Sequence, residues 1–144
     1  MLDLLNTYKR DKGDCYMKTI NKMMTNEEIY SYAIGMVNNL FIDNENYLPA
    51  AVVYSLQKNK STLVSIAEDI ERSRANVLQH YSLEQNGDQF KIDPAHVDDA
   101  NKELNDLLSI QQEVKIYACT IEELADVKFT SAQMESIMFM IYED

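Results

Sequence analysis

The sequence predicts a mainly α-helical protein of the α+β class, in which a long helix packs with two or three shorter helices and a small two- or three-stranded β-sheet. The chain of 144 residues has only three glycines and two prolines, which favours long regular segments over a turn-rich all-β fold. The stretch 50–86 contains neither residue type. Two short stretches, QFKI (89–92) and EVKIYACT (113–120), alternate polar and apolar residues, as half-buried strands do.

A capping box marks the start of the first predicted helix. In TNEE, the hydroxyl of Thr25 can accept a hydrogen bond from an amide of the first turn, and the carboxylate of Glu28 can reach back to the cap. Apolar residues then recur at helical spacing and predict a helix over 26–39. We therefore place a single helical domain at 25–144.

Residues 1–24 show no sustained apolar period. We expect them to form a loosely ordered N-terminal extension, in which MKTIN (17–21) could supply a short edge strand. The extension has five basic and three acidic residues, and the whole chain has a net charge of −11, so residues 25–144 carry −13.

This acidic domain limits the classes of partner. It repels phosphate backbones, which argues against direct nucleic-acid binding. It could attract a basic partner, it could imitate nucleic acid towards a protein that binds nucleic acid, or the charge could simply keep the protein soluble. No apolar run in the sequence is long enough to span a membrane, and no signal sequence opens the chain, so we expect a cytoplasmic protein.

The dominant element is a helix predicted over 49–83. Proline suits the first helical turn, where a missing amide proton is harmless. A helix of this length is about 50 Å long, so we expect it to project from the domain or to form a homo-oligomer along its apolar stripe. KNKS (58–61) leaves a break open, but the unbroken stripe favours a continuous or gently kinked helix. The stripe steps by seven residues through Pro49, Leu56, Leu63, Ile70 and Val77.

The stretch LEQNGDQFKIDP (83–94) is interpreted as a hairpin-like connector and not as an ion-binding loop. Asn86-Gly87 favours a turn, and Asp93-Pro94 supplies the cap and first position of a helix predicted over 94–111. We expect QFKI to pair with the strand predicted near 113–118, which would make one small sheet. The acidic stretch FIDNENY (41–47) lacks the glycine and the final glutamate of a calcium loop, so it is interpreted as a polar connector.

The C-terminal region repeats the capping pattern. Thr120 with Glu123 predicts a short helical turn, and Thr130 with Gln133 predicts the start of a terminal helix. Methionine-rich helices usually fill cores, but near a chain end they are also typical of adaptable interfaces. The candidate interface residues are Met134, Ile137, Met138 and Ile141.

The residues give little support for catalysis, and we expect neither an enzyme nor a metal or cofactor site. His80 and His96 belong to no recognisable catalytic motif, and the two cysteines match no metal or redox spacing. Two acid pairs, Glu68/Glu71 and Asp99/Glu103, could hold Mg²⁺ between two helices, as in helical nucleotide pyrophosphatases. Acids at this spacing are, however, ordinary on solvated helices.

A candidate ligand site lies on the long helix. Its basic residues could anchor a small anionic ligand between subunits, with tyrosine rings for stacking, although salt bridges on the helix surface explain the same residues. The candidate ligand-binding residues are Lys58, Lys60, Arg72, Arg74, Tyr54 and Tyr81.

Six motifs occur in a fixed order over about residues 25–143: TNEEIYSYA, YLPAAVVYSLQKNKSTL, AEDIERSRANVLQHY, ANKELNDLL, EVKIY and TSAQMESIMFMIYE. Their order resembles that of a family of small proteins encoded by phages and prophages of low-GC Gram-positive bacteria. The resemblance carries over no catalytic residue. It implies a viral accessory or assembly protein that works in the bacterial cytoplasm.

We therefore expect a non-enzymatic phage accessory protein that sequesters a component of host antiviral defence, either a defence protein or a signalling nucleotide. The alternatives are a virion or tail assembly chaperone or scaffold, and a magnesium-dependent nucleotide hydrolase. An apolar surface for a phage structural protein would favour assembly, and metal-dependent turnover would favour the hydrolase.

Overall fold

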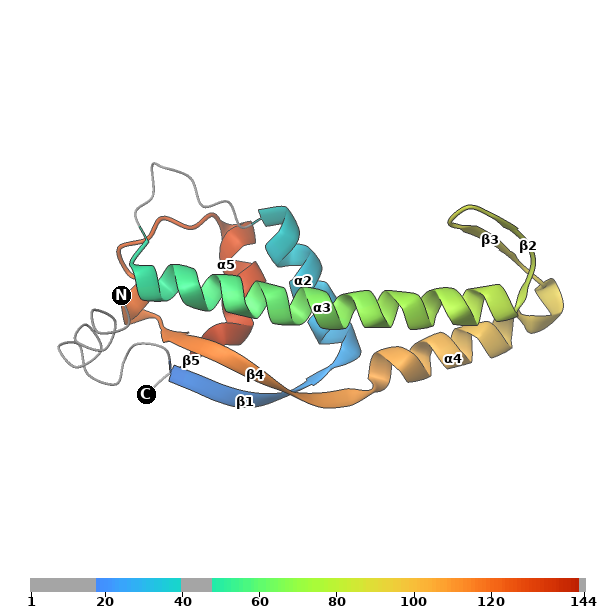
Figure 1. Cartoon of the computed structure of the whole chain (residues 1–144), viewed down its shortest axis with the longest axis horizontal. Helices are drawn as coiled ribbons and strands as arrows, with labels where there is room; N and C mark the ends of the chain where they lie inside the picture. Colours follow the sequence, from blue (N-terminus) through green and yellow to red (C-terminus); the bar gives the residue numbers. More distant parts are fainter. Residues whose placement is uncertain (1–17, 40–47, 143–144) are drawn as a thin grey trace, which may run out of the picture.

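The computed structural model describes residues 18–39 and 48–142, so residues 1–17 and the connector FIDNENY lie outside the described residues. The fold is of the α+β class, with a long helix and two small sheets. A compact body carries an arm made of two antiparallel helices, and a β-hairpin lies at the far end of the arm (Figure 1). The elements in chain order are β1 (Lys18–Thr25), α2 (Asn26–Asn39), α3 (Ala50–His80), β2 (Ser82–Asn86), β3 (Gln89–Ile92), η2 (Pro94–His96), α4 (Val97–Ser109), β4 (Gln111–Thr120), η3 (Glu122–Leu124), α5 (Ser131–Ile137), η4 (Met138–Met140) and β5 (Ile141–Tyr142).

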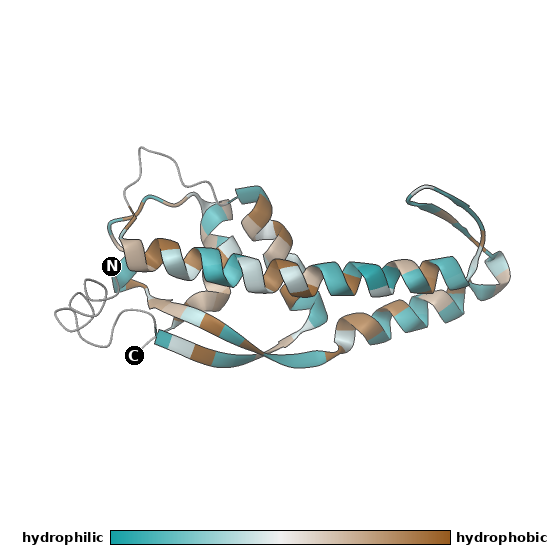
Figure 2. Cartoon of the chain, in the orientation of Figure 1, coloured by the Kyte–Doolittle hydropathy of each residue, from teal (hydrophilic) through white to brown (hydrophobic). Residues whose placement is uncertain are grey.

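The body is built on a three-stranded sheet in the order β1-β4-β5. β1 and β4 are antiparallel along their whole common length, and β5 adds a short parallel pair to the end of β4. The first part of α3 packs on this sheet, and α2 packs against both α3 and α5 (Figure 1). Apolar residues are frequent in these helices, whereas the arm part of α3 is more hydrophilic (Figure 2). The fully buried side chains of the core include Ile29, Met36, Leu63, Ile116, Ile137, Phe139 and Met140.

The predicted start of the domain at Thr25 is too late. Strand β1 pairs with β4 from Lys18 to Thr25, and Met24 is only 1% exposed in the core. The edge strand expected at MKTIN is therefore longer than its five residues and belongs to the domain. Its alternation is hidden because Lys22 occupies a half-buried position, where its Nζ donates a hydrogen bond to the carbonyl oxygen of Phe139 over 3.3 Å.

Helix α3 is continuous through KNKS, as the unbroken stripe predicts, and it ends at His80, before the predicted residue 83. The stripe itself packs inside the chain: Leu56, Leu63 and Ile70 are 3%, 0% and 4% exposed. These residues are therefore unavailable to a second copy. The structure therefore gives no support for a homo-oligomer along this part of the stripe, because other elements of the same chain cover Leu56, Leu63 and Ile70.

The expected pairing of QFKI with the strand near 113–118 is also wrong. β3 pairs instead with β2 in a separate hairpin, closed by a turn in which Gly87 has a φ of 60°, a conformation that glycine adopts without strain. The turn at Asn86-Gly87 is confirmed, and the hairpin connects the end of α3 to η2 and α4. Helix α4 separates β3 from β4, and its 13 residues span about 20 Å, so these two strands lie at opposite ends of the arm.

The base of the arm is tied to the body by Asn26, which is 4% exposed. Its backbone amide donates a hydrogen bond to the backbone carbonyl oxygen of Ile110 over 2.8 Å. Its side-chain amide donates one to the backbone carbonyl oxygen of Leu107 over 2.9 Å. The side-chain amide of Gln112 in turn donates to the side-chain oxygen Oδ1 of Asn26 over 2.8 Å. These bonds join the start of α2 to the turn between α4 and β4, and they set the direction in which the arm leaves the body.

Both C-terminal caps are confirmed, and the box of Thr130 and Gln133 is complete. The expected interface of the terminal helix is largely core. Ile137 is fully buried, and Met134 and Ile141 are partly buried against the same cluster. Only Met138 is exposed, at 51%. The segment forms part of the core because α5 packs against α2.

The thiol of Cys119 is expected to be unreactive in the folded protein. Burial raises its pKa from 9.0 to about 11, and the nearby carboxylate of Glu123 acts in the same direction. At pH 8 the thiolate fraction should be about a hundredfold lower than in the unfolded chain. We expect a Cys15→Ser variant to react with Ellman's reagent at least about a hundredfold faster in urea than when folded. Equal rates would show that the thiol is accessible.

Candidate functional site

A groove runs along one side of α3 where the arm leaves the body. Its first section lies between α2 and α3 and has a volume of about 240 Å³. Its second section, of about 520 Å³, adds the end of α4, and its third, of about 610 Å³, lies between α3 and the hairpin. Because Tyr30 lines the first two sections and Arg74 lines the last two, we treat them as one surface, the α3 groove.

Two apolar side chains of α2 form one wall of the first section. Ile34 and Val37 are 44% and 51% exposed, and both line this one section, so they form a shared apolar surface. They lie four and seven residues after Tyr30, so all three share one face of the helix. Val64 and Ala67 of α3 line the same section. The section is therefore an open, mainly apolar surface between two helices.

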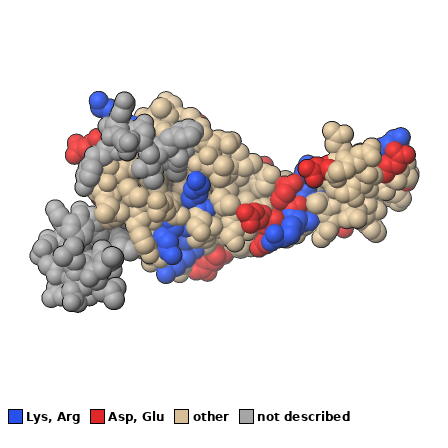
Figure 3. All heavy atoms as spheres, turned by 45° about the horizontal axis from the view of Figure 1, so that its top comes forward, with Lys and Arg blue, Asp and Glu red and all other residues tan. Residues whose placement is uncertain are grey.

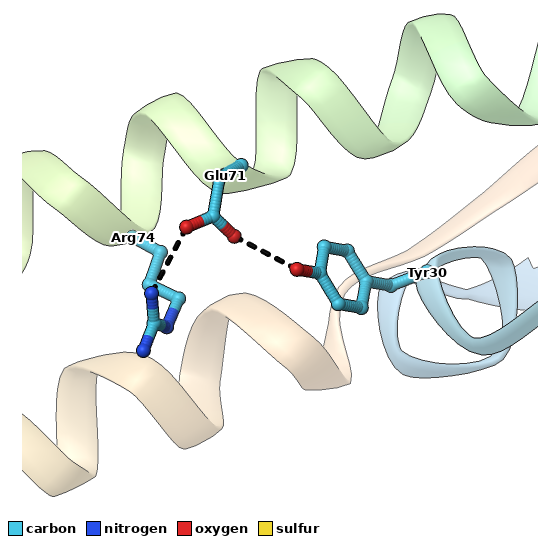
Figure 4. Close-up of polar contacts among 3 residues, drawn as sticks. All are labelled: Tyr30, Glu71 and Arg74. Atoms are coloured by element: carbon cyan, nitrogen blue, oxygen red, sulfur yellow. Dashed lines mark hydrogen bonds and ion pairs between the residues drawn. The ribbon is translucent and has the colours of Figure 1, made fainter. Parts of the chain in front are cut away.

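Glu71 is the polar centre of the groove (Figure 4). Its Oε2 accepts a hydrogen bond from the hydroxyl of Tyr30 over 3.0 Å, and its Oε1 accepts one from Nη1 of Arg74 over 2.9 Å. The hydrogen bond to the carboxylate, together with partial burial, raises the pKa of Tyr30. Glu71 therefore links α2 to α3 and holds Arg74 over the second and third sections.

Acidic and basic residues lie next to one another where the arm leaves the body (Figure 3). The two groove arginines are paired on their own helix: Arg74 with Glu71 and Arg72 with Asp69. Three further carboxylates line the groove and have no hydrogen-bond or ion-pair partner within residues 18–39 and 48–142. They belong to Glu27, Glu68 and Asp88. The groove thus combines an apolar section with unpaired negative charge.

The six predicted ligand-binding residues do not form one site in a single chain. Lys58 and Tyr54 lie together in the body, with the Lys58 ammonium 5.7 Å from the centre of the Tyr54 ring, and Lys60 is exposed two residues further on. Only Arg72 and Arg74 line the groove. Lys58 and Arg74 are separated by about 24 Å along the helix, which is too far for one small anion to contact both.

Tyr81 forms a third group at the far end of the arm. Its ring lies 4.7 Å from that of His80 and 5.7 Å from that of His96. A hydrogen bond with Glu103 raises the pKa of Tyr81, and His96 Nδ1 lies 3.1 Å from Asp99 Oδ2. These contacts link the end of α3 to the start of α4.

The two acid pairs considered for Mg²⁺ do not come together. Glu71 is bonded to Tyr30 at the base of the arm, whereas Glu103 lies beside Tyr81 at its far end. Within the part of the chain that the structure describes, no group of three or more His, Cys, Asp or Glu side chains could hold a metal ion.

The α2 wall of the groove was not identified from the sequence, although a signal was present. One face of the helix, with Ile29, Ala33 and Met36, is buried in the core. Ile34 and Val37 fall outside that face. A surface helix that has apolar residues on a second face is expected to have a second partner.

A comparison of the chain with known protein families, with curated proteins and with solved structures finds no match. Among the described helices, none combines the length and the apolar character that crossing a membrane requires.

Proposed function

We propose that this chain is a non-enzymatic phage accessory protein that sequesters a host defence protein in the bacterial cytoplasm. The observation that carries the proposal is the α3 groove, an open surface with two exposed aliphatic side chains, Ile34 and Val37, beside unpaired carboxylates. Exposed apolar surface with a polar rim is typical of protein–protein interfaces. The order of the phage-like motifs supports the viral context.

A protein partner is better supported than a signalling nucleotide. The basic residues that could bind phosphate are spread along α3, and both arginines at the groove are already paired with acids. The carboxylates of Glu27, Glu68 and Asp88 would repel a nucleotide, because like charges disfavour binding in a shared site. The same surface favours a partner with positive charge.

An assembly chaperone or scaffold is the second candidate. It is favoured by the end of the arm, where Leu83 is 60% exposed and Val97 is 42% exposed. Exposed apolar side chains at the end of an elongated arm could hold a phage structural protein before assembly. This function would depend on the arm end and not on Ile34 and Val37.

The test is an infection assay in a bacterium that carries an active defence system. Expression of the protein should raise phage plating efficiency by about tenfold or more, and Ile34→Ser/Val37→Ser should remove the increase because central apolar contacts dominate interfaces. The matched control, Met23→Ser/Ile121→Ser, changes two residues that are 58% and 46% exposed outside the groove and should keep full activity.

Two outcomes would contradict the proposal. Equal loss in the groove and control variants would show that the groove is not responsible. Loss in Leu83→Ser/Val97→Ser with an unaffected groove variant would favour the assembly function instead. Circular dichroism and thermal melting of every variant would show whether a loss of activity reflects a loss of folding.

A further inference from the structure

We infer that the partner segment that docks in the α3 groove is a basic amphipathic helix. The inference rests on the proposed function, and it names the chemistry of the partner at the same groove. Three features of the described residues support it: the shape of the groove, the lack of free backbone groups in its helical walls, and the position of its unpaired charges.

The shape of the groove fits a helix better than an enclosed ligand. Its lining residues on α3 run from Val64 to Ala75, which is about 16 Å, or three helical turns. The apolar first section, at about 240 Å³, is smaller than a typical small-molecule pocket of roughly 300–1,000 Å³. The other two sections, at about 520 and 610 Å³, reach that size but are lined by several charged side chains. The first section can take the apolar side chains that a helix presents at three- and four-residue spacing.

The walls of the first two sections are helices, which constrain the backbone of the occupant. The backbone amides and carbonyls in the middle of α2 and α3 bond within their own helices. They cannot pair with an extended peptide as a sheet edge would. A docked segment must therefore satisfy its own backbone hydrogen bonds, and a helix does so.

The charges around the groove specify the outer face of that helix. Glu27 lies on α2, Glu68 on α3 and Asp88 in the hairpin turn, so unpaired carboxylates border the groove from three elements. The positive charges of Arg72 and Arg74 are already balanced by Asp69 and Glu71. A helix with lysines or arginines beside its apolar stripe would complement this arrangement, and the charges would favour it over an acidic helix.

The experiment measures the fluorescence anisotropy of labelled model peptides of about 18 residues, or five helical turns. One peptide has leucines on one face and lysines on the other, a second replaces every lysine by glutamate, and a third replaces every leucine by serine. The leucine–lysine peptide should bind at least about tenfold more tightly than either of the others, because both apolar burial and charge complementarity are required.

Protein variants separate docking in the groove from general attraction to an acidic protein. Ile34→Ser/Val37→Ser should weaken binding of the leucine–lysine peptide by about tenfold without changing the charge. Glu27→Gln/Glu68→Gln should weaken it by about threefold and reduce its salt dependence. Glu122→Gln/Asp126→Asn removes two exposed acids outside the groove and should leave the affinity unchanged.

The outcomes distinguish this inference from the proposed function. Equal binding of the lysine and glutamate peptides, or equal effects of the groove and control acids, would overturn the basic helix as the partner. The plating assay could still succeed in that case, with a partner of different chemistry. If the leucine–lysine peptide binds in the groove but plating efficiency does not rise, the docking mode stands and the defence function fails.

Discussion

Replacing Asn59 by leucine is expected to lower the free energy of unfolding by about 3 kcal/mol. Asn59 lies on α3 and is fully buried. Its side-chain amide donates to the carbonyl oxygen of Tyr117 over 2.7 Å, and its carbonyl oxygen accepts from the Tyr117 amide over 2.8 Å. β5 pairs with β4 only at Cys119 and Thr120. At Tyr117, two residues earlier on β4, the Asn59 side chain makes the hydrogen bonds that a neighbouring strand would otherwise make.

Leucine has a similar size but no hydrogen-bonding groups, so the variant leaves the N–H and C=O of Tyr117 buried without a partner. Each such group costs about 1–3 kcal/mol. Urea unfolding measures the change. The control is Gln57→Leu, an exposed position two residues earlier on the same helix, which should stay within about 0.5 kcal/mol of the wild type. A similar result for Asn59→Leu would show that the two bonds contribute nothing.

Replacing Thr62 by proline is expected to lower the free energy of unfolding by about 3 kcal/mol or more. Thr62 lies in the middle of α3, which is continuous from Ala50 to His80. Proline there would remove the amide that bonds to the carbonyl oxygen of Lys58, and its ring would clash with that oxygen. The damage would fall where α3 packs on the body, between the buried residues Asn59 and Leu63.

The same substitution would behave differently if the helix were broken at 58–61. Ser61 would then cap a second helix, and proline at its first position would be tolerated. Urea unfolding of Thr62→Pro and Thr62→Ala decides between the two arrangements. Thr62→Ala should change stability by only a few tenths of a kcal/mol, because alanine is the better helix former. Two variants of equal stability would contradict a continuous helix.

Local sequence features predicted the elements of this fold well. The caps at Thr25, Asp93 and Thr130 are present with the expected hydrogen bonds. Gly87 forms the expected turn. These features depend on residues within about four positions of one another along the chain, so their chemistry can be identified without knowing the rest of the molecule.

Strand pairing was not predictable in the same way. QFKI alternates like a strand in either of two pairings, and only the length and direction of α4 place it beside β2 and away from β4. The full length of β1 was missed because its half-buried position at Lys22 is satisfied by the carbonyl of Phe139, 117 residues further along the chain. A contact at such a separation leaves no local pattern.

The sequence by itself determined where the helices begin to within a few residues, that α3 is long and continuous, and that the protein is acidic. Only the tertiary structure decided what the apolar residues of α2 and α3 do. It buries Leu56 and Leu63 in the core of the body, buries Ile70 elsewhere within the same chain, and leaves Ile34 and Val37 exposed in the groove. The reason is that periodicity shows which residues share a helix face, whereas burial depends on which other element covers that face.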